Sequence, residues 1–497
     1  MDRIGHFIGG KVVLGESGRT GPVYDPAAGR QTHEVDFASV AEADRAVEAA
    51  HDAFPAWRAT SLSRRSEILF RVRELLDEHR KDVATVITQQ HGKVLSDAMG
   101  EVARGLENVE FACGIPHLLK GDFSEQASTG VDVYSVRQPL GVVAGITPFN
   151  FPAMVPLWMG ANAVACGNTF VLKPSEKDPG ASLVIAELFR EAGLPDGVFN
   201  VIQGDKAAVD RLVEHPDVEA ISSVGSTPVA RYIYETGTGH GKRVQALGGA
   251  KNHMVVLPDA DVGMAADAAV GAGYGSAGER CMAISVIVTV GDVAEPLVKA
   301  ILERLPKVRI GPGMDPESEM GPLITREHRD KVASYLDSAR EQGGTVAADG
   351  REHELFGSSE GFFLGVSLID QVTPAMDCYR DEIFGPVLSV VRAGDYGDAL
   401  RLVNENPYGN GTAIFTRDGG AARRFQVDVN VGMVGVNVPI PVPVGYYSFG
   451  GWKRSLFGDT HMYGPEGIHF YTRGKVITAR WPDPATSGVD LGFPRTR

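Results

Sequence analysis

Hydrophobic and polar positions follow two different periods along this chain. Over residues 40–92 apolar side chains recur at helical spacing, first in 43–47 and then throughout 64–90. From Gly141 onward, short β-branched segments alternate with helix-like ones instead. Strands are predicted at 142–146, 169–173, 198–202 and 220–224, and helices at 155–165, 182–192, about 209–214 and from Pro228 onward. This alternation predicts an α/β fold: a doubly wound, dinucleotide-type parallel sheet with helices on both faces.

A second α/β domain is predicted where the alternation restarts after Leu247, with strands at 253–257 and 284–290. The segment 470–481 has strand character, and we expect it to pair with 131–138 as a small extra sheet. The expected division is therefore 1–123 with 140–246 as the cofactor domain, 247–435 as the catalytic domain, 124–139 with 436–482 as oligomerisation or bridging segments, and 483–497 as a loose tail.

Composition and charge narrow the function classes. Apolar residues make up 43% and charged residues 22% of the 497, which is ordinary for a soluble globular protein. The net charge of −15 disfavours a nucleic acid or an anionic membrane as partner. The four cysteines form no C-x-x-C pair and no zinc spacing, so neither a disulfide framework nor a metal site is expected. With no long apolar run and no signal-peptide core at the N-terminus, we expect a cytoplasmic protein.

Cys281 is the strongest candidate for chemistry. It lies in Gly-Ser-Ala-Gly-Glu-Arg-Cys-Met-Ala, after a turn of small residues, beside Arg280 and before an apolar strand. A cysteine is nucleophilic as the thiolate, whose free pKa of about 8.5 requires a positive neighbour or a helix N-terminus. The adjacent guanidinium is expected to supply that charge. The alternative is an inert, buried cysteine.

Two further candidates follow predicted strands, at the sheet edge where such folds bind ligands. Asn150, in Thr-Pro-Phe-Asn-Phe-Pro, has a side-chain amide that could donate to an oxyanion, or could cap the next helix. Lys173 and Glu176 suit the hydroxyls of a ribose, and the carboxylate favours NAD over NADP because it repels a 2′-phosphate. Taken alone, this pair is more typical of a solvated turn with a capping carboxylate.

Two more segments give weaker signals. Gly225 and Ser226 stand between a strand and a helix, where backbone N–H groups can approach a pyrophosphate. No G-x-G-x-x-G fingerprint accompanies them. Glu382 and Phe384 lie near a turn and suit contacts with a nicotinamide ribose. The alternative is an ordinary strand start.

The order and spacing of these segments closely resemble the aldehyde dehydrogenase superfamily, over nearly the whole chain from Gly5 to Trp481. The resemblance implies a cofactor domain, a catalytic domain and a small sheet that assembles homotetramers, or homodimers. It implies Cys281 as nucleophile and Asn150 as oxyanion donor. It implies an NAD site formed by Thr147, Phe149, Lys173, Glu176, Gly225, Ser226, Leu247, Glu382 and Phe384.

One motif departs from the superfamily pattern. Hydrolytic members carry a glutamate in Glu-Leu-Gly-Gly-Lys as base for the deacylating water, whereas this chain reads Gln-Ala-Leu-Gly-Gly-Ala-Lys over 245–251. Matching the glycines puts Ala246 at the glutamate position, and matching the lysine puts Leu247 there. Neither can take a proton. A general base is worth typically ~10²–10⁴ in rate, so its loss suggests that a thiol, not water, releases the acyl group.

Other segments resemble the CoA-acylating methylmalonate-semialdehyde dehydrogenases within this superfamily, including Gly-Ala-Lys-Asn-His, Gly-Glu-Arg-Cys-Met-Ala, 104–110 and 438–443. The resemblance implies NAD-dependent oxidative decarboxylation of methylmalonate or malonate semialdehyde to propionyl-CoA or acetyl-CoA. Arg104 and Arg280 would grip the substrate carboxylate. The alternatives are a surface helix charge for Arg104, an ion pair with Glu279 or Asp381 for Arg280, and a hydrolytic enzyme that releases a free acid.

Overall fold

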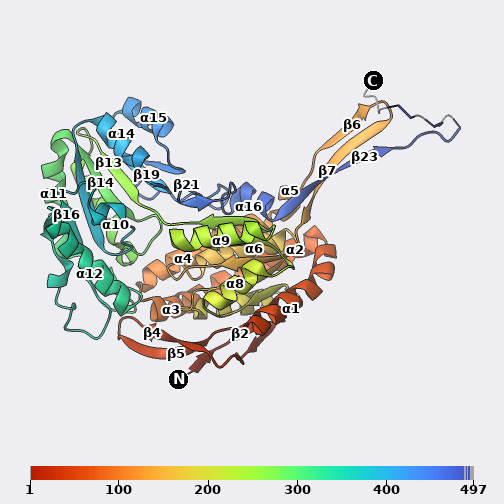
Figure 1. The fold of residues 1–497 in the computed structure, drawn as a ribbon, viewed down its shortest axis with the longest axis horizontal. Helices are drawn as coiled ribbons and strands as arrows, with labels where there is room; N and C mark the ends of the chain where they lie inside the picture. Colours follow the sequence, from red (N-terminus) through yellow and green to blue (C-terminus); the bar gives the residue numbers. More distant parts are fainter. Residues whose placement is uncertain (1, 486–487, 490, 493–497) are drawn as a thin grey trace.

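The computed structural model describes residues 2–485, 488–489 and 491–492, and its two largest sheets form the body of the protein (Figure 1). The larger has eight strands in the order β22-β12-β11-β8-β9-β10-β2-β3. Its five inner strands run parallel, as predicted: β12 (Arg243–Leu247), β11 (Val218–Val224), β8 (Val142–Ile146), β9 (Thr169–Lys173) and β10 (Phe199–Val201). The edge strands are antiparallel: β22 (Leu456–Phe457), β2 (His6–Ile8) and β3 (Lys11–Val13).

Helices cover both faces of this sheet. Successive residues of each strand point to opposite faces, and both sets are apolar, so both faces need a covering layer. Val143 and Phe170 belong to one apolar cluster, with α2 (Leu62–Glu78), α3 (Arg80–His91), α4 (Leu95–Cys113), α6 (Met154–Ala165) and α7 (Gly180–Glu191). Ala144 and Val171 belong to the opposite cluster, with α1 (Val40–Ala59), α8 (Lys206–Glu214) and α9 (Thr227–Gly239). The predicted helical stretch 40–92 is therefore three helices, broken at Thr60–Ser61 and at His79.

The second sheet has seven strands in the order β15-β16-β17-β14-β13-β19-β20. Its strands are β15 (Thr345–Ala348), β16 (Ser367–Asp370), β17 (Val387–Ala393), β14 (Ile284–Val290), β13 (Asn252–Val256), β19 (Gly411–Phe415) and β20 (Met433–Val436). All run parallel except β15. Its main helices are α10 (Val262–Tyr274), α11 (Ala294–Leu302), α12 (Arg326–Glu341), α14 (Tyr396–Glu405) and α15 (Gly419–Asp428). The predicted second α/β unit is present.

A long antiparallel sheet extends away from the body as an arm (Figure 1). It consists of β6 (Phe123–Ser128), β7 (Val131–Pro139) and β23 (Thr472–Arg480). Strand β23 pairs with β7 along its whole length, from Thr472 opposite Pro139 to Arg480 opposite Val131, which confirms the predicted pairing. Part of the predicted tail, at 486–487, 490 and 493–497, lies outside the described residues.

The remaining elements are short. β1 (Asp2–Ile4), β4 (Thr20–Asp25) and β5 (Arg30–Asp36) form a three-stranded sheet, and β18 (Tyr408–Gly409) pairs with β21 (Trp452–Lys453). Single-turn helices α5 (Ile115–Leu118) and α13 (Asp377–Arg380) and the longer α16 (Gly464–Phe470) complete the set. Across the described residues, no helix is long and apolar enough to cross a membrane.

Candidate active site

The carboxyl ends of the first sheet's parallel strands meet the amino ends of β14 and β17 of the second sheet around one cavity of about 200 Å³. It is lined by Pro148, Phe149, Asn150, Val224, Gly225, Ser226, Gly248, Gly249, Cys281, Glu382 and Phe384. The predicted segments that follow β8 and β11 contribute here, because parallel strands direct their following loops to the same sheet edge. Seven predicted site residues are thus brought together from loops far apart in the sequence.

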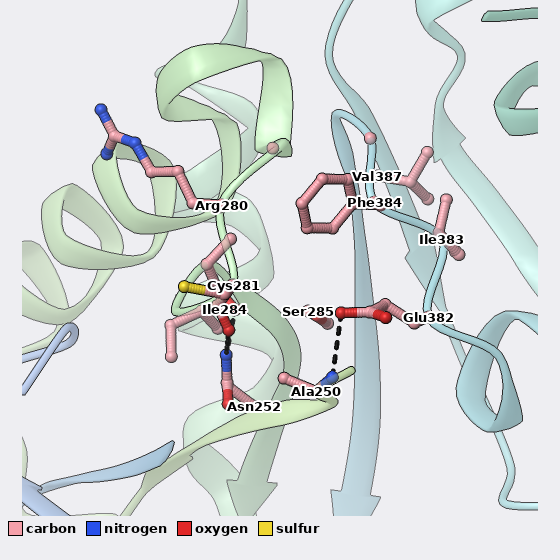
Figure 2. Close-up of a pocket in the computed structure, with 14 residues that line it drawn as sticks. Ala250, Asn252, Arg280, Cys281, Ile284, Ser285, Glu382, Ile383, Phe384 and Val387 are labelled. Atoms are coloured by element: carbon pink, nitrogen blue, oxygen red, sulfur yellow. Dashed lines mark hydrogen bonds between the residues drawn. The ribbon is translucent and has the colours of Figure 1, made fainter. Parts of the chain in front are cut away.

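The Cys281 loop is held in an unusual backbone conformation. The turn before it has three successive residues with positive φ: Ser276 (54°), Ala277 (52°) and Gly278 (73°). Such conformations cost non-glycine residues roughly 1–3 kcal/mol each and persist only where the surroundings impose them. Here the Asn252 amide donates to the Cys281 carbonyl oxygen at 2.9 Å, as Figure 2 shows, and the Asn410 amide donates to it at 3.2 Å.

These two asparagines were not predicted as site residues. Asn252 stands at the start of β13 and Asn410 just before β19, so both fix the nucleophile's backbone from the second sheet. The only sequence signal for Asn252 was its place in the Gly-Ala-Lys-Asn-His segment. Asn410 follows a glycine in Tyr-Gly-Asn-Gly, which reads as a turn.

The expected activation of the Cys281 thiol by its neighbour is not seen. The pKa of Cys281 is raised to about 12, chiefly by burial and also by the Glu382 carboxylate, and Arg280 opposes this with a smaller effect. Figure 2 shows the Arg280 side chain extending away from the sulfur. Its guanidinium instead pairs with Asp97 of α4 at 2.6 Å, so the predicted partners Glu279 and Asp381 are wrong. The ion pair with Asp97 holds the cation away from the thiol.

Glu382 faces the thiol side of the cavity from the loop between α13 and β17. Its Oε1 accepts a hydrogen bond from the Ala250 N–H at 2.9 Å (Figure 2). Burial raises the pKa of Glu382 to about 7, although the Ala250 N–H and Lys251 both oppose the rise. Phe384, at φ 58°, sets its ring edge-on to Phe149 with centroids 5.8 Å apart.

A second cavity, of about 530 Å³, opens on the other side of Cys281. It combines a charged set with an apolar wall: Asp97, Glu101, Arg104, Arg280, Phe151, Met154, Trp158, Met282, Ile440, Val442 and Phe449. Arg104 lies on α4, as predicted, and is about one-third exposed at 34%. It donates to both oxygens of Glu107, at 3.0 and 2.9 Å, and to the carbonyl oxygens of Val442 and Pro443. Arg104 is therefore a fixed part of the cavity lining.

Arg280 keeps unused hydrogen-bonding capacity in this cavity. Its Nε is buried and has no hydrogen-bond partner within the described part of the chain, and the same holds for Asp97 Oδ2. A buried donor without a partner is costly unless a ligand satisfies it. The two predicted arginines line one cavity that contains Cys281.

Ala246 and Leu247, the two positions that can align with the missing catalytic glutamate, pack on opposite faces of the sheet. Leu247 belongs to the apolar cluster against which Cys281 and Val224 pack, whereas Ala246 belongs to the cluster on the opposite face of the sheet. Consecutive strand residues point to opposite faces, so only one of them can face the thiol. Leu247 shares the apolar cluster of Cys281 without lining either cavity at the thiol, and neither its side chain nor that of Ala246 can accept a proton.

The residues predicted for the adenosine end lie apart from the first cavity. At the end of β9, the Lys173 Nζ donates to Glu176 at 3.2 Å. Burial alone would raise the pKa of Glu176, but the Lys173 ammonium and backbone N–H groups outweigh it and the pKa is lowered. The Thr147 N–H donates to the Lys173 carbonyl oxygen at 3.1 Å, which joins the two loops. Thr147, Lys173, Glu176 and Leu247 are absent from the described lining of that cavity.

The donor set fits a dinucleotide and not a metal ion. Ser226 caps the 13-residue helix α9 without a side-chain hydrogen bond, so the first N–H groups of that helix remain available to an anion. The ionised Glu176 is an acceptor for ribose hydroxyls. Among the described residues, no group of three or more His, Cys, Asp or Glu side chains is arranged to hold a metal ion.

Comparison with known proteins gives consistent matches over almost the full chain. A model of the aldehyde dehydrogenase family matches residues 13–477. The chain is 55% identical over 496 residues to the malonate-semialdehyde dehydrogenase of Pseudomonas aeruginosa, covering 99% of this chain and 100% of that protein. It is 46% identical over 481 residues to the mitochondrial, acylating methylmalonate-semialdehyde/malonate-semialdehyde dehydrogenase of Bos taurus, covering 97% and 89%. A Sinorhizobium meliloti structure complexed with NAD superposes with a TM-score of 0.96 at 53% identity, covering 98% and 99%.

Proposed function

Because the chain belongs to the aldehyde dehydrogenase family, we propose that it catalyses the NAD-dependent, CoA-acylating oxidation of malonate or methylmalonate semialdehyde. One observation carries the proposal. Cys281 lies between a cavity that contains two arginines and a cavity that fits a nicotinamide cofactor, with an apolar residue at the hydrolytic base position. That combination suits an aldehyde that bears a carboxylate and an acyl group that leaves to a thiol.

Cys281 is the nucleophile in this account. As thiolate it attacks the carbonyl carbon of the aldehyde, and the carbonyl π electrons move onto the oxygen. The Asn150 side-chain amide and the Cys281 backbone N–H donate to this oxyanion and so stabilise the transition state. Loss of such a donor typically costs about 10²–10³ in rate, so Asn150 carries a large share of the catalysis.

The cofactor is NAD, and the chain holds it at three places. Glu176 and Lys173 bind the adenosine ribose, where the carboxylate disfavours a 2′-phosphate. The N-terminus of α9 at Gly225 and Ser226 receives the pyrophosphate. Glu382 and Phe384 bound the nicotinamide end, and Thr147, Phe149 and Leu247 complete the set of cofactor-binding residues. When bound, NAD supplies the oxidant that accepts hydride from the carbon attached to Cys281.

The carboxylate end of the substrate is bound by Arg280 and Arg104. Both arginines line the cavity that contains Cys281, so a substrate carboxylate bound there lies beside two guanidinium groups. The apolar wall at Trp158, Met154 and Phe449 leaves room for the α-methyl group of methylmalonate semialdehyde beside malonate semialdehyde.

The acyl group then rests on Cys281 as a thioester that still bears a β-carboxylate. Loss of CO₂ leaves the C–C electron pair on the α-carbon, where the thioester carbonyl delocalises it until a proton adds. The thiol of CoA, as co-substrate, attacks the acyl carbon, and Cys281 leaves as thiolate. The products are acetyl-CoA or propionyl-CoA, and NADH. A hydrolytic enzyme that releases a free acid is the alternative, and the apolar side chain of Leu247 disfavours it.

Assembly and domain division are part of the proposal. We assign 1–123 with 140–246 to the cofactor domain, 247–435 to the catalytic domain, and 124–139 with 436–482 to assembly. The arm presents exposed Phe123 and Val476, which suits a homotetramer, or a homodimer, formed through β6, β7 and β23. Static light scattering before and after Val476→Asp tests this, since an unchanged mass would contradict it.

The proposed thioester on Cys281 can be tested by trapping the acyl group on the enzyme. Wild-type protein is incubated with NAD and malonate semialdehyde without CoA, and its peptides are analysed by mass spectrometry. We expect an acetyl adduct on the peptide that contains Cys281, and its removal after CoA is added. An unmodified Cys281 peptide during active NADH formation would contradict the proposal.

A further inference from the structure

A fully buried lysine holds the loop that carries Asn150. Lys93 follows Gly92, which ends α3 at φ 95°. Its side chain is 0% exposed, and Nζ donates to the carbonyl oxygen of Asn150 at 2.6 Å and to Glu101 Oε2 at 2.9 Å. The ammonium also lies 4.4 Å from the ring centroid of Phe151. Lys93 thus contacts both the backbone of Asn150 and the side chain that follows it.

Glu101 holds the other end of the same loop. It lies on α4, and its Oε1 accepts hydrogen bonds from the N–H groups of Ala153 at 2.8 Å and Met154 at 3.2 Å. These N–H groups begin α6, which has no side-chain cap from its own N-cap residue Ala153. Glu101 therefore supplies from another helix the acceptor, and the negative charge, that a helix N-terminus favours.

The two side chains together fix the segment from Asn150 to Met154 at four points. Both are removed from water, at 0% exposure, and desolvating two charges is a cost that well-packed apolar residues would avoid. An apolar pair could fill the same space, but it could not hold a carbonyl oxygen and two N–H groups in fixed positions. This favours a role in placing the loop accurately over a role in stability alone.

We propose that Lys93 and Glu101 are positioning residues that set the location of the Asn150 amide for the oxyanion. The inference rests on the proposed function, in which Asn150 stabilises that oxyanion. Neither residue is proposed to touch the substrate's reacting atoms. Helix α4 presents Asp97, Glu101 and Arg104 at helical spacing along the second cavity. One helix therefore positions Arg280 through Asp97 and Asn150 through Glu101, and this fixes the separation between the carboxylate and aldehyde ends of the substrate.

The test is a double-mutant cycle on the first turnover. The burst rate of NADH formation with malonate semialdehyde is measured for wild type, Lys93→Met, Asn150→Ala and the double variant. We expect Lys93→Met to slow the burst by about 10- to 100-fold, since small misplacements of a catalytic group cost about 10². In the Asn150→Ala background it should add less than about 3-fold, because the group it positions is gone. A full, multiplicative loss in both backgrounds would overturn the proposal.

Lys242→Met is the matched control. Lys242 is another buried lysine whose Nζ donates to backbone carbonyl oxygens, those of His215 and Val218, before β12 at the opposite end of the sheet. The Lys242→Met variant removes a buried ammonium that does not contact the Asn150 loop. Its burst rate should therefore stay near that of wild type. NAD binding, followed by fluorescence, should be unchanged in Lys93→Met. A loss in the control equal to that in Lys93→Met would overturn the proposal.

Glu101→Gln keeps the proposal testable if Lys93→Met does not fold. The amide retains an acceptor for the Ala153 N–H but loses the charge that pairs with Lys93, so we expect a slower burst with unchanged NAD binding. A wild-type burst in Glu101→Gln would contradict the positioning role. If Asn150→Ala itself keeps a wild-type burst, the assigned oxyanion role fails. If only the Lys93 and Glu101 variants keep it, the positioning inference alone fails.

Discussion

The guanidinium of Arg280, which is the residue directly before Cys281, donates a 2.6 Å hydrogen bond to Asp97 on helix α4. The bond uses Nη2, and the buried Nε has no hydrogen-bond partner within the described residues. Asp97 therefore fixes the orientation of the guanidinium at the cavity. An acid inside a cavity that binds a carboxylate is unfavourable unless it orients the cation, and the single short bond to Arg280 supports that role.

Asp97→Ala is expected to raise KM for malonate semialdehyde by about tenfold, since a freed arginine loses side-chain order before it can bind. KM for propanal, which has no carboxylate, should stay near its wild-type value. Asp267→Ala serves as control, because its partner Arg304 lies in a surface ion pair away from the site. A lower KM for the semialdehyde would mean that Asp97 repels the substrate and does not orient Arg280.

Alkylation of the free enzyme by iodoacetamide is expected to rise about tenfold per pH unit between pH 7 and 9. The reason is that burial and Glu382 hold the pKa of Cys281 at about 12, so only the small thiolate fraction reacts throughout this range. Glu382→Gln removes the neighbouring negative charge and should speed alkylation at fixed pH. Peptide mapping separates Cys281 from the buried Cys113, Cys166 and Cys378. A rate that levels off below pH 9 would contradict the raised pKa.

Leu247→Glu is expected to introduce CoA-independent release of free acid, whereas Ala246→Glu is not. The side chain of residue 247 packs on the Cys281 face of the sheet, and that of residue 246 on the opposite face. A positioned base is worth typically about 10²–10⁴, so a gain of tenfold or more over wild type is expected in the presence of NAD alone. Thermal unfolding accompanies the assay, since both variants bury a carboxyl. A gain in the Ala246 variant alone would reverse the assignment.

Much of this site could be predicted from the sequence because its residues lie directly before or after strands. Asn150, Gly225 and the Cys281 loop each sit next to a β-branched segment, and parallel strands bring such positions to one edge. The arm was predictable for a similar reason, because 131–139 and 472–480 both have strand character.

The residues that support the site could not be predicted in this way. Lys93 and the carbonyl of Asn150 are 57 positions apart, and Arg280 and Asp97 are 183 apart. No local pattern marks such a pair, so the sequence does not single out Asp97 as the partner of Arg280. The pKa of the Cys281 thiol could not be predicted for the same reason. Arg280 is next to Cys281 in sequence but extends away from its sulfur, so burial is the main influence on the pKa of Cys281.

The most direct test of the account is NADH formation from malonate semialdehyde and NAD, with and without CoA, at enzyme concentrations high enough to resolve one turnover. We predict a burst stoichiometric with the active sites when CoA is absent, and sustained turnover when it is present. That result would show that the acyl group stays on the enzyme until a thiol removes it. Sustained turnover without CoA would contradict the account, because water would then deacylate Cys281 with help from a base other than residue 246 or 247.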